Sequence, residues 1–241
     1  KLSNHGDRLA ATQGRDDESE AYHKGQVDLL TPLVKATGTD AAFEVSSRAI
    51  QVYGGHGYLK DHPVEQYCRD AKIFQIYEGT NFIQSMDLVS RKLGQAGGAN
   101  TQAFLTDIQN FITAHKETPE LEEGIGHLQA AHEAVAASVM KLIAWFKGGK
   151  LEHIPLAAED FLSIMSDLAV GWLLLDQAAI ALKKLPETSK THPDHAFYTG
   201  KKFAAQYFAN NVLSTLPART RRLSSIDTLP VEIPDEAFAT V

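Results

Sequence analysis

One long apolar helix is predicted by the stretch LAAEDFLSIMSDLAVGWLLLDQAAIALKKL, which runs from Leu156 to Leu185. A helix that is apolar on several sides is normally buried at the centre of a helical domain. Two lysines at 183 and 184 complement the negative end of this helix, and Pro186 ends it. The longest unbroken apolar run, residues 169–175, is far shorter than the roughly 20 residues that cross a bilayer. The stretch therefore predicts a core helix and no transmembrane segment.

Further helical patterns lie on both sides of this core helix. Apolar residues recur at three- and four-residue steps over residues 104–112 and 128–146, and a last helix is predicted from 193 to about 217. The side chains expected to face the core in the last helix are Phe203, Tyr207 and Phe208. Four consecutive amphipathic helices with short links predict an antiparallel bundle over residues 101–241. Because no alternating strand pattern is present, the predicted fold class is all-α.

The first hundred residues predict a second, smaller group of helices. Residues 1–24 are polar and are expected to form a loop or to be disordered. A helix is predicted to begin near Thr31 and Pro32, because Thr caps helices and Pro suits the first helical position. Glycines 54 and 55 end this helix. Its expected packing face is a narrow stripe of small residues: Val34, Gly38, Ala41, Val45, Ala49 and Val52.

Two shorter helices are predicted after the glycine pair. Pro63 can open one of them, over residues 64–71, and Thr80 is a candidate N-cap for the next. The residues expected on the apolar face of the second are Phe82, Met86, Val89 and Leu93. The glycine-rich segment 94–100 predicts a domain boundary. The expected organisation is a loop over 1–24, a helical domain over 25–95 and a helical extension over 101–241.

The composition narrows the class of protein. With 241 residues, of which 44% are hydrophobic, the chain can bury a substantial core. A formal net charge of −7 argues against a nucleic-acid-binding protein, because such proteins neutralise phosphates with Lys and Arg. The single cysteine, Cys68, cannot form an internal disulfide and is expected to be a small buried side chain. Together with an N-terminus that lacks an apolar signal core, it predicts a cytoplasmic protein. No metal site is expected from the spacing of the histidines.

Two motifs are candidates for chemistry. The first, Gln51-Val-Tyr-Gly-Gly-His-Gly-Tyr58, can be a helix end with a loop behind it, or a turn that lets the backbone approach a phosphate. The second, Arg69-Asp-Ala-Lys-Ile-Phe-Gln-Ile-Tyr-Glu-Gly-Thr-Asn81, places Glu78 between an aromatic residue and a glycine before a predicted helix. That carboxylate can simply favour the positive end of the helix, or it can be a base against an apolar substrate.

The segment from about Leu30 to Leu93, which contains both motifs, resembles the C-terminal helical domain of the acyl-CoA dehydrogenase family. Residues from about 101 onward resemble the helical C-terminal extension of larger bacterial members. The resemblance implies that Glu78 is the base that removes the proton alpha to a thioester, while FAD takes a hydride from the beta carbon. It also implies that the backbone N–H of Glu78 donates to the thioester carbonyl, that Tyr77 lines the acyl cavity and that Gly79 permits close approach.

The resemblance also implies a set of cofactor contacts. Those expected to touch FAD are Gln51, Gly54 and Gly55, across a subunit boundary in the family, and Thr80 with its neighbour Asn81. Two residues depart from the family pattern: Phe82 replaces a polar residue and is expected to pack in the core, and Gln66 replaces a Lys or Arg. Neither departure affects the base.

The expected function is the C-terminal portion of an FAD-dependent acyl-CoA dehydrogenase that acts on acyl-CoA. The resemblance implies electron-transfer flavoprotein as the electron acceptor and a homo-oligomeric enzyme. The chain lacks counterparts of the family's other domains, so it is expected to be a fragment that is inactive alone. Two alternatives remain: an acyl-CoA oxidase with similar chemistry, and a non-catalytic helical oligomerisation module of the same fold.

Overall fold

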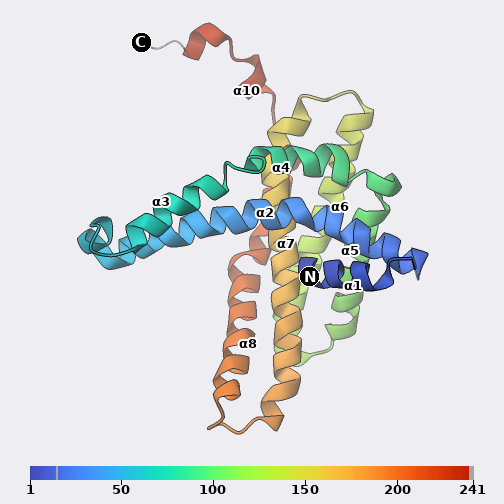
Figure 1. The fold of residues 1–241 in the computed structure, drawn as a ribbon. Helices are drawn as coiled ribbons and strands as arrows, with labels where there is room; N and C mark the ends of the chain where they lie inside the picture. Colours follow the sequence, from blue (N-terminus) through green and yellow to red (C-terminus); the bar gives the residue numbers. More distant parts are fainter. Residues whose placement is uncertain (15, 239–241) are drawn as a thin grey trace. The chain divides into compact units, whose positions relative to one another are not determined.

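The computed structural model describes residues 1–14 and 16–238, and every regular element in these ranges is a helix, as predicted (Figure 1). The chain divides into two compact units, unit 1 from Lys1 to Thr101 and unit 2 from Gln102 to Val241. Each unit has its own buried apolar residues, and each is described by itself.

Unit 1 is organised around one long helix, α2 (Asp17–Tyr53). Helix α1 (Leu2–Thr12) packs on it, and the short η1 (Gly54–Tyr58) turns the chain back into α3 (Val64–Phe74), which lies along α2. The unit continues with α4 (Asn81–Asp87), the π-helical turn η2 (Leu88–Lys92) and η3 (Gln95–Gly98). Helix α5 (Ala99–His115) begins at its end and continues into unit 2.

The loop predicted over residues 1–24 is wrong, because this segment contains α1 and the first turns of α2. The Asp16 carboxylate accepts a hydrogen bond from the backbone N–H of Ser19 at 3.1 Å, so it caps α2. The acidic residues that follow it favour the positive end of a helix. The charged residues 16–18 therefore form a helix start; Arg15, which precedes them, lies outside the described residues. Buried His5 on α1 contacts buried His23 on α2, with their Nδ1 atoms 2.9 Å apart.

The predicted helix start at Thr31 and Pro32 is also wrong, because both residues lie inside α2. The Thr31 hydroxyl donates to the Val27 carbonyl at 2.7 Å instead of capping a helix. Pro32 has no N–H for the helical ladder, and the helix continues past this one missing donor with Pro32 buried. Position within a long helix, which residues 17–30 establish, overrides the local preference of a Thr-Pro pair for a helix start.

Unit 2 contains the predicted bundle. Its long helices are α6 (Glu122–Lys147), α7 (His153–Lys184) and α8 (Pro193–Asn211), and α8 returns alongside α7 (Figure 1). The shorter elements are η4 (Pro119–Leu121), η5 (Leu185–Glu187), η6 (Leu213–Thr215), α9 (Leu216–Ser224), α10 (Leu229–Glu232) and η7 (Asp235–Phe238). Helix α7 is long and apolar enough to cross a membrane, but most of its apolar window is buried within the protein, which favours the core helix that its sequence predicts.

The last helix differs from its prediction in where it ends and in which of its residues are buried. It ends at Asn211, and Leu216 with Pro217 begins a new helix, α9, instead of ending α8. Helix α8 buries Ala205 and Ala209, whereas Phe203 and Tyr207 are 63% and 70% exposed. Phe208, the third residue expected to face the core, is half-buried. Ala209 lies near Gly124 of α6, where a Cβ would be 3.6 Å away, so a small residue fits this close approach.

Ion pairs attach α9 to α7. Arg219 contacts the Asp167 carboxylate at 2.5 Å and the Ser163 hydroxyl at 2.9 Å, and Arg222 pairs with Asp160. These arginines therefore have partners within unit 2.

Candidate active site

The glutamate motif forms a loop that α3 delivers to the side of α2. We call residues 75–81 the Glu78 loop. The loop starts directly after α3 and ends at the first residue of α4, where the backbone N–H of Asn81 donates to the Gln75 carbonyl at 3.1 Å. Because α3 runs back along α2, the loop lies beside the middle of α2.

The backbone of the loop is unusual at its centre. Glu78 has a φ of 53° and Gly79 a φ of 87°, both in the left-handed region. Glycine adopts this region without strain, but a glutamate does so only where its surroundings hold it there. Among the described residues, Ala96 is the other non-glycine residue with positive φ. Held strain of this kind clusters at functional sites, so it supports a functional role for Glu78.

The Glu78 side chain is exposed and available. Within the described residues its carboxylate makes no hydrogen bond and no ion pair, so it has no packing role in this chain. Its backbone N–H likewise donates no hydrogen bond to the described part of the chain. A free carboxylate and a free donor on the same residue are what a base with an attached oxyanion donor requires.

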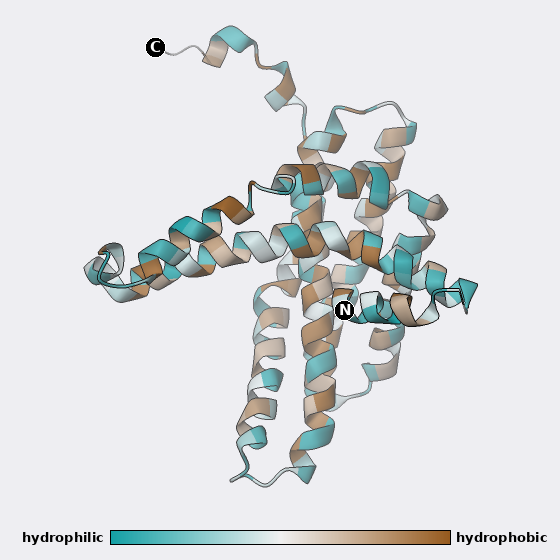
Figure 2. Ribbon diagram, in the orientation of Figure 1, coloured by the Kyte–Doolittle hydropathy of each residue, from teal (hydrophilic) through white to brown (hydrophobic). Residues whose placement is uncertain are grey.

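Apolar residues flank the loop on both sides, at the end of α3 and the start of α4 (Figure 2). Tyr77 is 47% exposed, and its ring centroid lies 6.0 Å from that of Phe74. The other large exposed apolar residues next to the loop are Ile73, Ile76, Phe82 and Ile83. The expectation that Phe82 packs in the core is therefore wrong for this chain. The buried positions of α4 and η2 are Ser85, Leu88 and Lys92, one step away from the predicted stripe. Of the stripe itself, Leu93 is buried as predicted, whereas Met86 and Val89 are half-buried.

Thr80 caps α4, as the sequence predicts. Its hydroxyl oxygen accepts a hydrogen bond from the Ile83 backbone N–H at 3.3 Å. The cap fixes where the loop ends and the helix begins. The implied contact of Thr80 with a cofactor is compatible with this role, because Thr80 is exposed.

The Asn81 side chain forms hydrogen bonds with residues of α2. Its amide nitrogen donates to the Asp40 carboxylate at 2.7 Å and to the Thr39 hydroxyl at 3.0 Å, and its amide oxygen accepts from the Lys35 ammonium at 2.7 Å. These bonds account for the residue without a cofactor. Sequence reasoning missed the partners on α2, because they lie some 40 positions earlier in the chain and no local pattern marks them.

The glycine motif lies at the other end of the hairpin that α2 and α3 form (Figure 1). Gln51, Gly54 and Gly55 are exposed where α2 ends, 11 residues beyond Asp40, which is about 17 Å along a helix. The structure therefore does not bring them together with Glu78 in one chain. Gly57 has a clear packing role that the sequence did not reveal, because a Cβ there would lie 2.7 Å from the Ile50 carbonyl oxygen.

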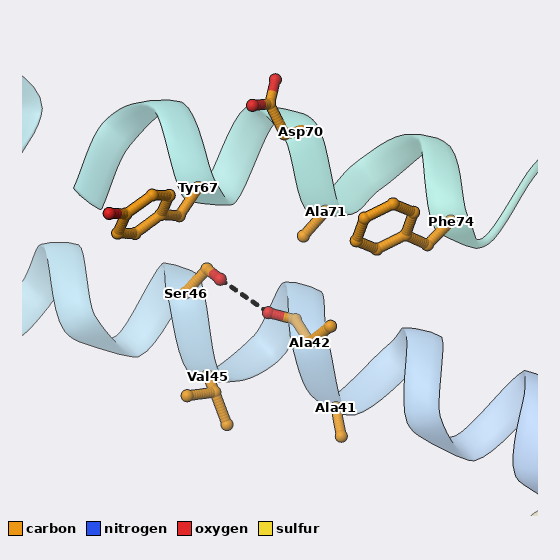
Figure 3. Close-up of a pocket in the computed structure, with 8 residues that line it drawn as sticks. All are labelled: Ala41, Ala42, Val45, Ser46, Tyr67, Asp70, Ala71 and Phe74. Carbon is orange, nitrogen blue, oxygen red and sulfur yellow. Dashed lines mark hydrogen bonds between the residues drawn. The ribbon is translucent and has the colours of Figure 1, made fainter. Parts of the chain in front are cut away.

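An open groove of about 540 Å³ lies between α2 and α3. Tyr67, Ala71 and Phe74 point from α3 toward α2, whereas Asp70 points away (Figure 3). The groove ends at Phe74 and does not include Glu78. In the described ranges, no cluster of three or more His, Cys, Asp or Glu residues could hold a metal ion.

The expected packing of the small-residue stripe on α2 is wrong within this chain. Val34, Val45 and Val52 are 52%, 65% and 86% exposed. Ala41 and Val45 line the groove between α2 and α3, but α3 leaves Val45 largely exposed. Cys68 is half-buried, not buried as expected.

Comparison with known proteins identifies the fold and the family. Residues 104–234 match a family model described as acetyl-CoA dehydrogenase C-terminal like, and residues 9–93 match the acyl-CoA dehydrogenase C-terminal domain. The structure resembles a Bacillus anthracis acyl-CoA dehydrogenase solved in complex with FAD, with a TM-score of 0.64 at 16% identity over 98% of this chain and 40% of that one. That likeness shows the shared fold.

Relatives in sequence agree with this assignment. The chain is 31% identical over 222 residues to a butyryl-CoA dehydrogenase of Syntrophomonas wolfei, which covers 92% of this chain and 36% of the relative. It is 32% identical over 216 residues to a broad-specificity linear acyl-CoA dehydrogenase of Mycobacterium tuberculosis, covering 88% and 35%. The chain belongs to the acyl-CoA dehydrogenase family, as its two motifs predicted, and it spans about a third of the length of these relatives.

Proposed function

We propose that this chain is the C-terminal portion of an FAD-dependent acyl-CoA dehydrogenase in which Glu78 is the catalytic base. The observation that carries the proposal is the Glu78 loop, which presents a free carboxylate at positive φ between exposed apolar side chains. An apolar surface beside the base suits an acyl chain and the flat ring system of a flavin. When bound, FAD supplies the acceptor for the hydride that leaves the beta carbon of the substrate.

The residues of this chain perform the proton half of the reaction. The Glu78 carboxylate removes a proton from the alpha carbon of the acyl-CoA and becomes a carboxylic acid. The electron pair of that C–H bond forms the double bond of a trans-2-enoyl-CoA as the hydride leaves. The free backbone N–H of Glu78 donates to the thioester carbonyl, which stabilises the negative charge that develops on its oxygen. The exposed apolar neighbours of Glu78 offer a surface on which the acyl chain can lie beside the carboxylate.

The test uses the complete polypeptide with bound FAD, acyl-CoA substrates of several chain lengths and an artificial electron acceptor. Replacing Glu78 by Gln removes the base but keeps the shape of the side chain. We expect turnover to fall by at least 10²- to 10⁴-fold, the usual contribution of a general base. FAD content and the dissociation constant of the product enoyl-CoA should stay unchanged. A Glu78→Gln enzyme with normal turnover would refute the role of Glu78 as the base and support a non-catalytic helical role for this chain.

We further propose electron-transfer flavoprotein as the physiological acceptor, on the basis of the family. Anaerobic reduction of the flavin by substrate, followed by slow reoxidation in air, is expected of a dehydrogenase. Rapid reoxidation by oxygen would instead identify an acyl-CoA oxidase.

We also propose that the complete enzyme is a homo-oligomer. The support is the exposed stripe of α2, because Val45 and Val52 present apolar surface that a solvent-facing helix does not need. Light scattering of the complete enzyme should give a mass of two or more protomers, and a Val45→Asp substitution should lower it. A monomeric mass for the unaltered enzyme would contradict this proposal without affecting the role of Glu78.

A further inference from the structure

A single carboxylate on α2 binds both ends of the Glu78 loop. The Oδ1 atom of Asp40 accepts a hydrogen bond from the Gln75 amide at 2.6 Å and another from the Asn81 amide at 2.7 Å. Gln75 is the first residue of the loop and Asn81 the last. One side chain, fixed on a long helix, thus joins the two points between which Glu78 is suspended.

The other atoms of the two amides also have partners. The Gln75 side-chain oxygen accepts from the Lys72 ammonium at 2.7 Å, and the Asn81 side-chain oxygen accepts from the Lys35 ammonium at 2.7 Å. Both amide orientations are therefore determined, because each oxygen faces a cation and each nitrogen faces the Asp40 carboxylate. We call Asp40, Gln75 and Asn81 the Asp40 network.

We propose that Asp40 is a positioning residue for the base Glu78, and this inference rests on the proposed function. The positive φ of Glu78 is a strained conformation for a non-glycine residue and persists only where neighbouring contacts enforce it. Glu78 itself makes no side-chain contact that could do so within the described residues. The loop ends are held by the closure between Gln75 and Asn81 and by the bonds of both residues to Asp40. Inside the loop, the Gln84 amide donates a longer hydrogen bond of 3.5 Å to the Glu78 carbonyl.

Loss of the Asp40 carboxylate removes the shared acceptor of the two loop ends. The loop can then relax, and Glu78 can adopt the ordinary backbone region, which swings its carboxylate to a new position. A displacement of about 1 Å at a reacting group can lower a rate by roughly 10²-fold. The N-terminal cap of α4 at Thr80 does not depend on Asp40, so the helices should survive.

The experiment compares four variants of the complete FAD-bound enzyme. Asp40→Ala removes the acceptor, whereas Asp40→Asn keeps an oxygen that can accept both hydrogen bonds and is the conservative variant. Gln75→Met removes one of the two donors at nearly constant shape. Glu44→Ala is the matched control, because Glu44 lies one turn further along α2 in an exposed pair with Arg48.

We expect Asp40→Ala to lower kcat by roughly 10- to 100-fold, with FAD content and KM for the acyl-CoA near those of the unaltered enzyme. The kcat of Asp40→Asn should recover most of the loss seen in Asp40→Ala. The kcat of Gln75→Met should lie between those two variants, and the kcat of Glu44→Ala should match that of the unaltered enzyme. The kinetic isotope effect with an alpha-deuterated acyl-CoA should rise in Asp40→Ala, because a misplaced base slows proton abstraction specifically. A purely structural role would not raise it.

The outcomes separate the two proposals. Unchanged kcat and isotope effect in Asp40→Ala would overturn the positioning role. If Asp40→Ala does not fold with FAD, Gln75→Met decides, and normal turnover in that variant overturns the inference. If Glu78→Gln is inactive while both network variants are fully active, the positioning inference fails and the proposed function stands. If Glu78→Gln is fully active, the proposed function fails and the inference fails with it.

Discussion

Gly171 lies where α7 meets the turn η6, and its replacement by Ala tests the packing of unit 2. A Cβ at this position would lie 2.5 Å from Cδ2 of Leu213 and 2.7 Å from its Cδ1 and Cγ. Carbon atoms in contact are normally about 3.5–4.0 Å apart, so the methyl group overlaps by about 1 Å. Leu213 is fully buried, and three of its side-chain atoms are involved, so its side chain or the backbone must shift to admit the methyl group.

Two effects of opposite sign determine how much Gly171→Ala changes the free energy of unfolding. Overpacking of a core costs about 1–3 kcal/mol, whereas replacing a glycine inside a helix by Ala stabilises by roughly 0.5–1 kcal/mol. We therefore expect Gly171→Ala to lower the free energy of unfolding of unit 2 by roughly 1–2 kcal/mol. Gly126 on α6 is the matched control, because a Cβ there meets nothing within 4 Å. Gly126→Ala should stabilise by the helical effect alone.

Intrinsic tryptophan fluorescence during urea unfolding measures this difference. Both tryptophans of the chain, Trp145 and Trp172, lie in unit 2, so the signal reports that unit. The double variant with Leu213→Ala should be more stable than the sum of the two single effects predicts, because the second change removes the atoms that clash. Equal stabilisation by Gly171→Ala and Gly126→Ala would refute the reasoning and would show that η6 moves freely.

Two further predictions concern buried polar groups. His132 places Nε2 3.0 Å from the Leu105 carbonyl, Nδ1 has no partner among the described residues, and burial lowers its pKa. The unfolded state then binds the proton more readily than the folded state. The contribution of His132 to the stability of unit 2 should therefore be full above about pH 6.5 and be lost as the pH drops through the lowered pKa. A His132→Gln variant with the same pH dependence of its urea midpoint would contradict this. In unit 1, the ammonium of buried Lys92 lies 3.3 Å from the Asp28 carboxylate. Asp28→Ala should destabilise by about 1–3 kcal/mol in circular dichroism melts, and adding Lys92→Met should recover part of that loss.

The sequence was sufficient to predict a structural feature where the interactions behind that feature are local in the chain. The cap at Thr80 joins residues three positions apart, and the long apolar stretch specifies α7 by its own composition. The errors at the N-terminus were also local, but they had competing local interpretations. A charged string reads equally as loop or as a capped helix start, and Asp16 decides for the helix through its bond to Ser19.

The apolar stripes show a different limit of sequence analysis. A stripe predicts that a face is covered but does not say by what. Phe203 and Tyr207 were expected inside the bundle, yet Ala205 and Ala209 are the residues that α8 buries against its own unit. A close helix contact favours small residues, so Phe203 and Tyr207 lie on the exposed face of α8.

Asn81 shows that a sequence motif can mark a candidate site without revealing what holds it together. Its place beside the proposed base suggested a contact with the cofactor, whereas its amide binds Asp40, 41 residues away in the chain. That partnership exists only because α3 reverses along α2 and returns the loop to the middle of that helix. On the proposed function, Asn81 therefore serves the proposed base by fixing the loop that carries it. On this reasoning, a substitution of Asn81 that keeps both the amide nitrogen and the amide oxygen within reach of α2 should preserve turnover better than one that keeps only the size of the side chain.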